Sequence, residues 1–433
     1  MDFLTIALLS IVLSIVLIIL GVPIAYSIGI CTIGAIIIGL GPAPLTKVGL
    51  IIYNQFHSLS WIPLPLFMLM ACIISQTKIG EDVFDAVSKW LARVPGGLLV
   101  SSVCGEGILS ATIGNSGTTL LTVGTVVKPE IERMGYNKLF SVSTLVGGGV
   151  LGALIPPSVP MIIYAVIAQS SISKLFLAGI LPGILLIVML AAYIIITCKR
   201  HPEYAPSYHI KATLLEKIVS LRKVWPVLAL IIGIIVGIYS GAATATEAGA
   251  IGVVLSLVIA VFLYRFRFKQ LVKAVQQAAT LTAMVCMMII GVNCFTYVAA
   301  VSGLSKNLNN WVMGLGLSPV MVVVMINIII LVLGFIMDGL AIMMVTLPLF
   351  VPLIIGLGLD PIWFGVLAVV NIEIGLITPP AGLNLFMAST VFDVSVGKLI
   401  KSIWPVVFLL IIFLGILIAF PEISLLIPRL SFA

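Results

Sequence analysis

Short segments rich in glycine, proline and polar residues interrupt the long apolar stretches of this sequence. Their side chains and unpaired backbone groups could bind ligands. The segment 114–117 (GNSG) cuts one apolar stretch, and Gly152 is followed closely by Pro156 and Pro157. Because proline lacks a backbone N–H and disfavours helix in the residue before it, a proline pair leaves carbonyl oxygens unpaired. Carbonyl, hydroxyl and amide oxygens are the ligands that hard cations take, so the pattern indicates a site for an ion such as Na⁺.

The glycine and its proline pair recur 223 residues later, where Gly375 is followed by Pro379 and Pro380. The same offset joins further helix-breaking positions: Gly80 and Gly303, Pro129 and Pro352, Gly135 and Gly358, Asn137 and Asp360, Pro182 and Pro405. We therefore predict that residues 63–182 and 286–405 are two copies of one unit. Interrupted hydrophobic segments at matching places in two halves indicate the binding site of a secondary transporter, whose copies have inverted topology.

The composition predicts what surrounds these breaks. Of the 433 residues, 61% are hydrophobic and 9% are charged, and the mean hydropathy is +1.32. A soluble domain carries about 25% charged residues, so this chain lacks the polar surface that a water-soluble protein needs. Because one span takes roughly 20 apolar residues, we predict an all-α polytopic membrane protein with about 11 transmembrane helices.

Two hairpins and two interrupted helices are expected to contain the breaks. Non-helical backbone cannot face lipid, because its unpaired groups would cost several kcal/mol each, so each break is buried or lines a wet cavity. We predict re-entrant helical hairpins that turn at 114–119 and 337–339, followed by interrupted helices over 139–168 and 362–391. Residues 81–94 carry apolar side chains at helical spacing, which predicts an amphipathic helix in the membrane interface or, alternatively, a cytosolic connector helix.

The two copies predict two cation sites of similar design, and hence two or more coupling Na⁺ ions. The first site would use these residues of the hairpin and interrupted helix: Ser110, Gly114, Asn115, Ser116, Gly152, Ile155 and Pro156. The second would use Asp338, Gly339, Gly375, Thr378 and Ala381. Expected substrate contacts are Asn115, Ser116, Pro157, Ser158, Pro380 and Asn384.

Acidic residues within the apolar stretches are few, and each is a candidate for function: Glu106, Glu247, Asp338 and Glu373. Asp338 is the strongest because it lies at a break, although it could instead only cap a helix. Glu373 could be a structural partner, and Glu106 and Glu247 could lie near a membrane surface. No lysine or arginine lies next to the central breaks, so an anionic substrate would need helix dipoles and bound cations to offset its charge.

Basic residues gather in 198–223 and 265–273, which predicts that both segments are cytoplasmic. These clusters flank apolar runs and accompany no nucleic-acid-binding motif, so no nucleic-acid partner is expected. The first apolar run has no basic segment before it, and we expect it to remain as a helix. The six cysteines lack metal-ligand spacing, and we predict that most are buried thiols.

Three segments resemble the large membrane subunit of the TRAP (tripartite ATP-independent periplasmic) transporters. They read GALIPPSVP at 152–160, LAGILPG at 177–183 and FGVLAVVNIEIGLITPPAGLNLF at 364–386. The likeness extends over nearly the whole chain from about residue 20. One departure lies in the first hairpin, where residues 113–118 read IGNSGT and the family has a sequence like SGSSAA. The residues of the second predicted site fit the family pattern better than those of the first.

This resemblance implies a Na⁺-coupled importer of organic acids, such as C4-dicarboxylates, sialic acid or other carboxylates and sulfonates, in the bacterial inner membrane. It implies an elevator mechanism with four segments: scaffold helices and the interfacial helix (1–95), a first transport half (96–197), a cytoplasmic loop with further scaffold helices (198–318), and a second transport half (319–433). It also implies two protein partners. They are a small four-helix membrane subunit, expected as a separate chain, and a soluble periplasmic binding protein.

Two other classes of protein are alternatives. Re-entrant hairpins also build ion or solute channels, but a channel repeats its filter through subunit symmetry, whereas this chain carries two different breaks. An intramembrane enzyme would need a converging nucleophile and base or a metal set, and His57, His201 and His209 form no such cluster. We therefore predict a carrier and no enzyme activity.

Overall fold

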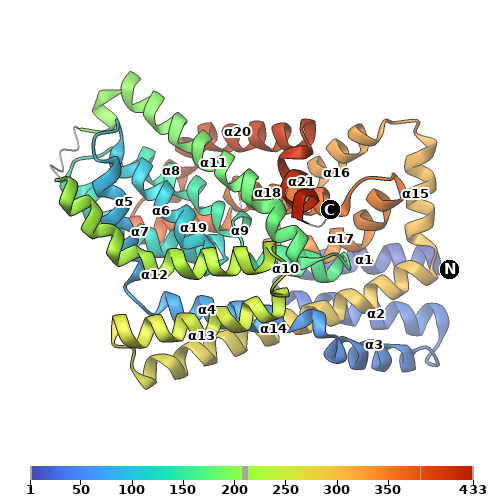
Figure 1. Cartoon of the computed structure of the whole chain (residues 1–433). Coiled ribbons are helices and arrows are strands. Elements are labelled where there is room, and N and C mark those ends of the chain that lie inside the picture. The colour runs from blue at the N-terminus through green and yellow to red at the C-terminus, as the bar shows by residue number, and fades with distance from the viewer. Residues whose placement is uncertain (1, 207–212, 381, 432–433) are drawn as a thin grey trace.

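The computed structural model describes residues 2–206, 213–380 and 382–431, and within these residues the regular secondary structure is helical (Figure 1). Helices outside the two copies are α1 (Phe3–Ile19), α2 (Ile24–Leu40), α3 (Leu45–His57), α12 (Leu214–Tyr239), α13 (Ala245–Tyr264) and α21 (Glu422–Ser431). Two short 3-10 helices, η1 (Leu59–Trp61) and η2 (Pro202–Tyr204), join longer ones. The predicted all-α class is confirmed for the described residues.

The first copy contains eight helices in the described range. They are α4 (Pro63–Ser75), α5 (Ile79–Leu91), α6 (Gly97–Ile113), α7 (Ser116–Arg133), α8 (Lys138–Gly149), α9 (Leu151–Leu154), α10 (Val159–Ile167) and α11 (Ile172–Arg200). The second copy contains α14 (Phe268–Val301), α15 (Leu304–Gly314), α16 (Pro319–Gly334), α17 (Gly339–Gly356), α18 (Pro361–Ile377), α19 (Leu383–Phe392) and α20 (Val396–Ala419). Helices α7 and α17 begin and end 223 residues apart, as the duplication predicts.

The helices end where the sequence breaks were predicted. Helix α6 ends at Ile113, and Gly114 follows with φ of +63°, a left-handed conformation that glycine adopts without strain. Asn115 then caps α7 by accepting a hydrogen bond from the Thr118 N–H at 3.0 Å. At the second turn Asp338 caps α17 and accepts from the N–H groups of Leu340 and Ala341 at 2.9 and 3.1 Å. This second turn is two residues longer, because α16 already ends at Gly334.

The two predicted interrupted helices are also observed. Helices α8 and α9 end at Leu154, and α10 begins at Val159 after the proline pair. Helix α18 ends at Ile377, and α19 begins at Leu383. The Pro156–Pro157 and Pro379–Pro380 peptide bonds are both cis.

Helix α5 is the predicted amphipathic helix, with its apolar face buried and its acids directed to neighbouring helices. The Tyr264 hydroxyl of α13 donates to Asp82 at 2.8 Å, and Lys223 of α12 lies 3.8 Å from Asp82 and 3.7 Å from Asp85. The helix is confirmed, and its place in the membrane interface stays a prediction. These contacts join α5 to helices outside the first copy.

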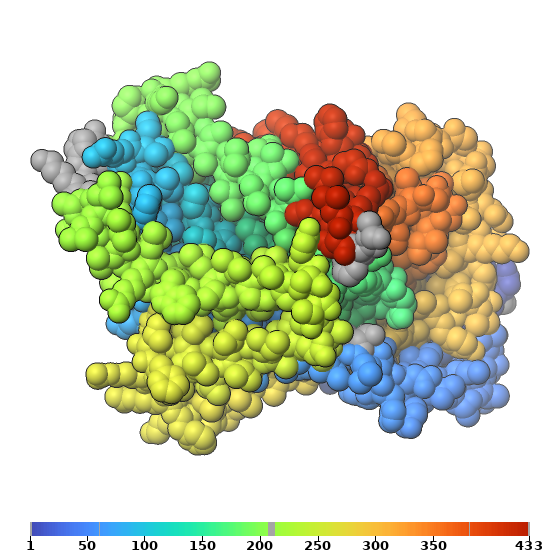
Figure 2. Space-filling view, in the orientation of Figure 1, coloured from blue at the N-terminus to red at the C-terminus, as the bar shows by residue number. Residues whose placement is uncertain are grey.

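The exterior of the molecule is apolar along several helices. Helix α12 crosses the face seen in Figure 2, above the yellow α13, and large apolar side chains on both are exposed: Trp225, Ile232, Val236 and Phe262. Among the described residues, six helices are long and apolar enough to cross a membrane, or eight if two bent pairs each count as one span. Exposed apolar surface of this kind fits a lipid environment. The predicted number of about 11 spans would include several shorter apolar helices and stays a prediction.

The two hairpins approach one another from opposite ends of the molecule. In Figure 1, α5, α6 and α7 lie toward one end of the long horizontal helices, and α15, α16 and α17 lie toward the other. This arrangement accounts for how two copies of one unit can meet at their turns near the centre.

We predict that the ends of α7 and α17 face opposite sides of the membrane. Glu132 and Ile355 are 223 residues apart, and both are exposed in the last turns of these helices. A cysteine at either position should react with a membrane-impermeant thiol reagent from one side only, and the two sides should differ. The unaltered chain is the control, because its six cysteines are buried or half-buried. Labelling of both positions from the same side would exclude inverted topology.

Candidate functional site

A cavity of about 810 Å³ lies between the two hairpin turns and the helices outside the transport halves. One wall comes from the turns and interrupted helices: Asn115, Ser116, Gly117, Pro160, Asp338, Gly339, Leu340, Glu373, Leu383 and Asn384. The other comes from the link between α1 and α2 and from α14: Gly21, Val22, Pro23, Tyr26, Met284, Met287 and Met288. The cavity therefore brings together both copies and the first helices of the chain.

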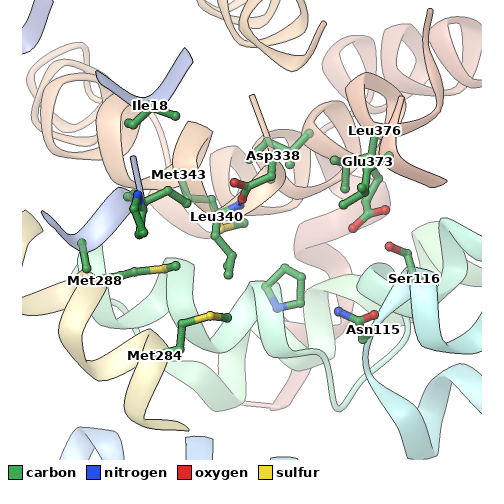
Figure 3. A pocket seen from close by; sticks show the side chains of 18 of the residues that line it. Ile18, Asn115, Ser116, Met284, Met288, Asp338, Leu340, Met343, Glu373 and Leu376 are labelled. Atoms are coloured by element: carbon green, nitrogen blue, oxygen red, sulfur yellow. The ribbon is translucent and has the colours of Figure 1, made fainter. Parts of the chain in front are cut away.

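Figure 3 shows Asp338 and Glu373 reaching toward one end of this cavity, with Asn115 and Ser116 opposite Glu373. The Ser116 hydroxyl hydrogen-bonds the Glu373 carboxylate and accepts from the Asn384 amide at 3.3 Å. Glu373 is 3% exposed, and its Oε2 atom has no partner among the described residues. Ser116 thus connects the turn of the first copy to both parts of the interrupted helix of the second.

Several helices begin at the cavity wall. Ser116, Gly339 and Leu383 are the first residues of α7, α17 and α19, and Pro160 lies in the first turn of α10. The first N–H groups of a helix lack intrahelical partners, and its N-terminal end carries a partial positive charge. Among the described residues, those that line the cavity include no lysine, arginine or histidine. Helix N-termini are therefore the positive groups that this cavity offers to an anion.

The first hairpin turn packs directly on the break of its own copy. The Gly114 carbonyl accepts from the Val159 N–H at 3.0 Å. A side-chain carbon at Gly152 would lie 2.7 Å from the Asn115 carbonyl oxygen, so only glycine permits this approach. Of the residues predicted for the first site, Asn115 and Ser116 line the cavity. The other residues predicted at this break lie in or behind the packed contact and do not line the cavity: Gly114, Gly152, Ile155, Pro156, Pro157 and Ser158.

Three predicted hydroxyl ligands bond to backbone carbonyls of their own copy. Ser110 donates to the Glu106 carbonyl, Thr378 to Ile374 and Ser158 to Ala153. The Ser158 hydroxyl also accepts from the Met161 N–H at 3.3 Å, and none of the three residues lines the cavity.

In the second copy, Asp338, Gly339 and Asn384 line the cavity, and Gly375 and Pro380 do not; their roles in binding stay predictions. Gly375 lies at a close crossing of two helices, where a side-chain carbon would lie 2.7 Å from the Gly334 Cα. Ala381 lies outside the described residues.

The four acidic candidates have different surroundings. Asp338 caps α17 and also lines the cavity, so both of its predicted roles have structural support. Glu247 is exposed and caps α13 through Thr244. Glu106 is fully buried away from this cavity, rather than at a protein surface.

Sequence reasoning missed the wall opposite the hairpins. Five methionines line the cavity: Met284, Met287, Met288, Met343 and Met387. The first three recur at helical spacing on α14, a signal that the uniformly apolar sequence around them conceals. The Gly21–Pro23 break was visible as a helix boundary, but nothing in the sequence connected it with the site.

Two helical hairpins and two interrupted helices surround one cavity in this apolar, helical protein. This arrangement is typical of a multi-pass membrane carrier of solutes. Residues 11–423 match the family described as "Tripartite ATP-independent periplasmic transporter, DctM component", and the chain belongs to this family. The resemblance to the large membrane subunit of the TRAP transporters is thus confirmed. The family is one of transporter permeases rather than enzymes.

Two curated relatives illustrate the family. The C4-dicarboxylate TRAP transporter large permease protein of Pseudomonas aeruginosa is 35% identical over 392 residues, which are 90% of each chain. The sialic acid TRAP transporter large permease protein of Vibrio cholerae is 30% identical over 85% of this chain and 86% of its own. The fold is similar to the crystal structure of the YdaH transporter of Alcanivorax borkumensis, with a TM-score of 0.64, 14% identity, and coverage of 88% of this chain and 90% of that one.

We predict opposite effects of the same substitution at two glycines. Gly314 ends α15 with nothing within 4 Å of an added carbon, so Gly314→Ala should raise the thermal unfolding midpoint, since alanine favours helix by about 1 kcal/mol. Gly334→Ala should lower the midpoint, because its methyl group meets Gly375 and overpacking costs about 1–3 kcal/mol. Equal midpoints of the two purified variants would contradict the close crossing of α16 and α18.

Proposed function

We propose that this chain imports a small organic acid by Na⁺-coupled secondary transport, and that the cavity between the hairpin turns binds the substrate. The observation that carries the proposal is the combination of helix N-termini with two carboxyl groups and no basic side chain. A carboxylate or sulfonate can accept hydrogen bonds from the N-termini of α7, α17 and α19. The names of the two relatives, which specify C4-dicarboxylate and sialic acid, support this class of substrate.

Bound cations would offset the charge that remains. Asp338 adds negative charge to a cavity that must hold an anion, so an anion alone would meet repulsion there. A Na⁺ ion beside Asp338, with carbonyl oxygens of the second break, would remove that repulsion. A second Na⁺ ion would use the carbonyl oxygens at the first break together with Asn115 and Ser116. Substrate and cations would then bind together, which is the thermodynamic basis of coupling.

An elevator movement is the form of transport that the packing supports best. Helix α7 packs on α19, and α10 packs on α17 and α18, so the two transport halves interlock. Helices α2, α4, α13 and α14 pack on one another, and of this group α14 and the start of α2 contribute to the opposite wall. The interlocked halves would slide as one body along that wall, whose methionine side chains adapt to changing neighbours.

The proposed assembly has two further proteins, in agreement with the tripartite family description. A separate small membrane subunit with four helices would cover part of the exposed apolar surface. A soluble periplasmic binding protein would deliver the substrate to the chain in the bacterial inner membrane.

Uptake into proteoliposomes that contain the chain and both partner proteins tests this function. Radiolabelled C4-dicarboxylates, sialic acid and simple sulfonates should be compared with and without an inward Na⁺ gradient. We expect saturable uptake of at least one acid that requires both the gradient and the binding protein. Uptake that is insensitive to Na⁺ would refute the coupling, and uptake without saturation would indicate a channel.

We predict that Asp338→Asn weakens the response to Na⁺ but preserves the fold. Asparagine caps helices as well as aspartate does, so α17 should keep its first turn, while the carboxylate charge is lost. The Na⁺ concentration for half-maximal thermal stabilisation should rise at least about tenfold, which corresponds to about 1.4 kcal/mol. Asp360→Asn is the matched control, because Asp360 caps α18 by accepting from the Ile362 N–H at 2.8 Å and does not line the cavity. An equal response to Na⁺ in both variants would show that Asp338 only caps α17.

A further inference from the structure

Glu106 lies in the middle of α6, the inner arm of the first hairpin, and the proposed function makes no use of it. It is 0% exposed, and neither carboxyl oxygen has a hydrogen-bond partner among the described residues. A buried carboxylate without a partner costs several kcal/mol, because it leaves water without gaining a compensating charge. Its charge must therefore be balanced by a basic side chain, by a metal ion or by a proton.

The described part of the chain brings no basic group to Glu106. Ion pairs on the helices packed around α6 join charged residues to one another and none of them to Glu106: Lys89 with Asp85, Lys223 with Asp82 and Asp85, Lys138 with Glu132, Arg133 with Glu130, and Lys128 with Asp393. Cys104 on α6, Cys72 on α4, and Tyr193 and Cys198 on α11 are further titratable side chains on these elements, and no contact links them to the Glu106 carboxyl.

A metal ion fits no better. No group of three or more histidine, cysteine, aspartate or glutamate residues that could hold a metal occurs in the described ranges, and the backbone carbonyls in the middle of α6 are paired within the helix, so a cation such as Na⁺ finds no ring of free oxygens there. The neighbours of the carboxyl group are instead small and apolar. A side-chain carbon at Gly148 on α8 would overlap with Oε2 of Glu106 and would lie 3.3 Å from a methyl carbon of Val103. A proton needs no further ligands, which leaves it as the partner.

The second copy has a neutral polar pair at the same place. Glu106 lies seven residues before the end of α6 at Ile113, and Asn327 lies seven residues before the end of α16 at Gly334. Asn327 faces Asn371, the counterpart of Gly148 at the 223-residue offset.

The contacts of this second pair are well formed. The Asn371 amide donates to the Asn327 carbonyl at 2.6 Å and to its side-chain oxygen at 3.0 Å. In both copies, a buried polar side chain therefore joins the inner arm of the hairpin to the interrupted helix. In the first copy this side chain is titratable, and in the second it is a neutral amide.

We propose that Glu106 is a proton-binding site of the transport core. The carboxyl group holds a proton as a neutral acid while α6 packs on α8. When the arm separates from α8 and water reaches the group, its O–H bond breaks, the proton passes to water and the carboxylate remains.

Proton binding at this position links pH to the movement of the first hairpin. The packed state holds one proton more than the hydrated state, so lower pH favours packing and higher pH favours separation. The equilibrium between the two states shifts by up to about tenfold per pH unit for one proton. Glu106 lies about two turns from the hairpin turn that lines the cavity, so closure of that turn on substrate would depend on pH. This last step rests on the proposed transport function, whereas protonation of Glu106 does not.

Infrared difference spectroscopy of the purified chain tests the protonation directly. The spectrum of the unaltered chain minus that of Glu106→Gln at pH 7 should contain the carbonyl band of a protonated carboxylic acid. The corresponding difference for Glu247→Gln should contain carboxylate bands, because Glu247 is exposed. Loss of carboxylate bands in Glu106→Gln would overturn the proposal and would indicate a bound cation instead. Glu106→Leu, of similar size and without charge, serves as the second variant if glutamine prevents folding.

Hydrogen exchange of the segment 97–133 tests the link to movement. After correction for the intrinsic effect of pH on exchange, exchange in the unaltered chain should increase up to about tenfold per pH unit between pH 6 and 9. In Glu106→Gln this increase should be lost, and Glu247→Gln should behave as the unaltered chain. A pH response that persists in Glu106→Gln would show that another group is responsible. Failure of Na⁺-coupled uptake alone would count against the proposed function and leave both results interpretable.

Discussion

The need to satisfy every backbone polar group inside an apolar protein determines how this site can be built. A turn or an interrupted helix within the membrane frees N–H and C=O groups, and water is scarce there to bind them. At each break in this chain, nearby residues pair some of the freed backbone groups. Asn115, Asp338 and Ser158 cap the helices that restart, and the Gly114 carbonyl receives the N–H of Val159 from the neighbouring break. The groups that remain are concentrated at one cavity, where substrate and ions can complete them.

Duplication explains the architecture, and divergence between the copies explains the chemistry. Asn115 and Asp338 occupy the same position in the two turns, and both cap the following helix, but only one carries charge. Glu373 corresponds to Val150, so the second interrupted helix brings an acid to the cavity and the first does not. The proposed ion and substrate sites are therefore similar in backbone geometry and different in charge. A carrier can use such a difference to bind cations and an anion side by side.

The sequence predicted the breaks well and the surroundings of the breaks poorly, and the reason is physical. Glycine, proline and capping residues act locally, so Gly114, Asn115, Asp338 and both proline pairs identified the turns without tertiary information. Contacts between helices were harder to predict. When a helix is apolar on every side, its sequence pattern does not indicate which face packs on a neighbour. Met284 and Met288 on α14, and the link between α1 and α2, could not be connected with the site for this reason.

Glu106 illustrates the same limit for a charged residue. From sequence it could lie in a core or near a membrane surface, because a single acid within an apolar run fits either place. Only the packing of α8 distinguishes them, since the absence of a side chain at Gly148 leaves room for the carboxyl group. In the second copy the Asn371 side chain fills the corresponding space and bonds to Asn327. Both contacts join a hairpin arm to an interrupted helix, and an acid with a glycine in the first copy puts a titratable group where the second copy has an amide pair.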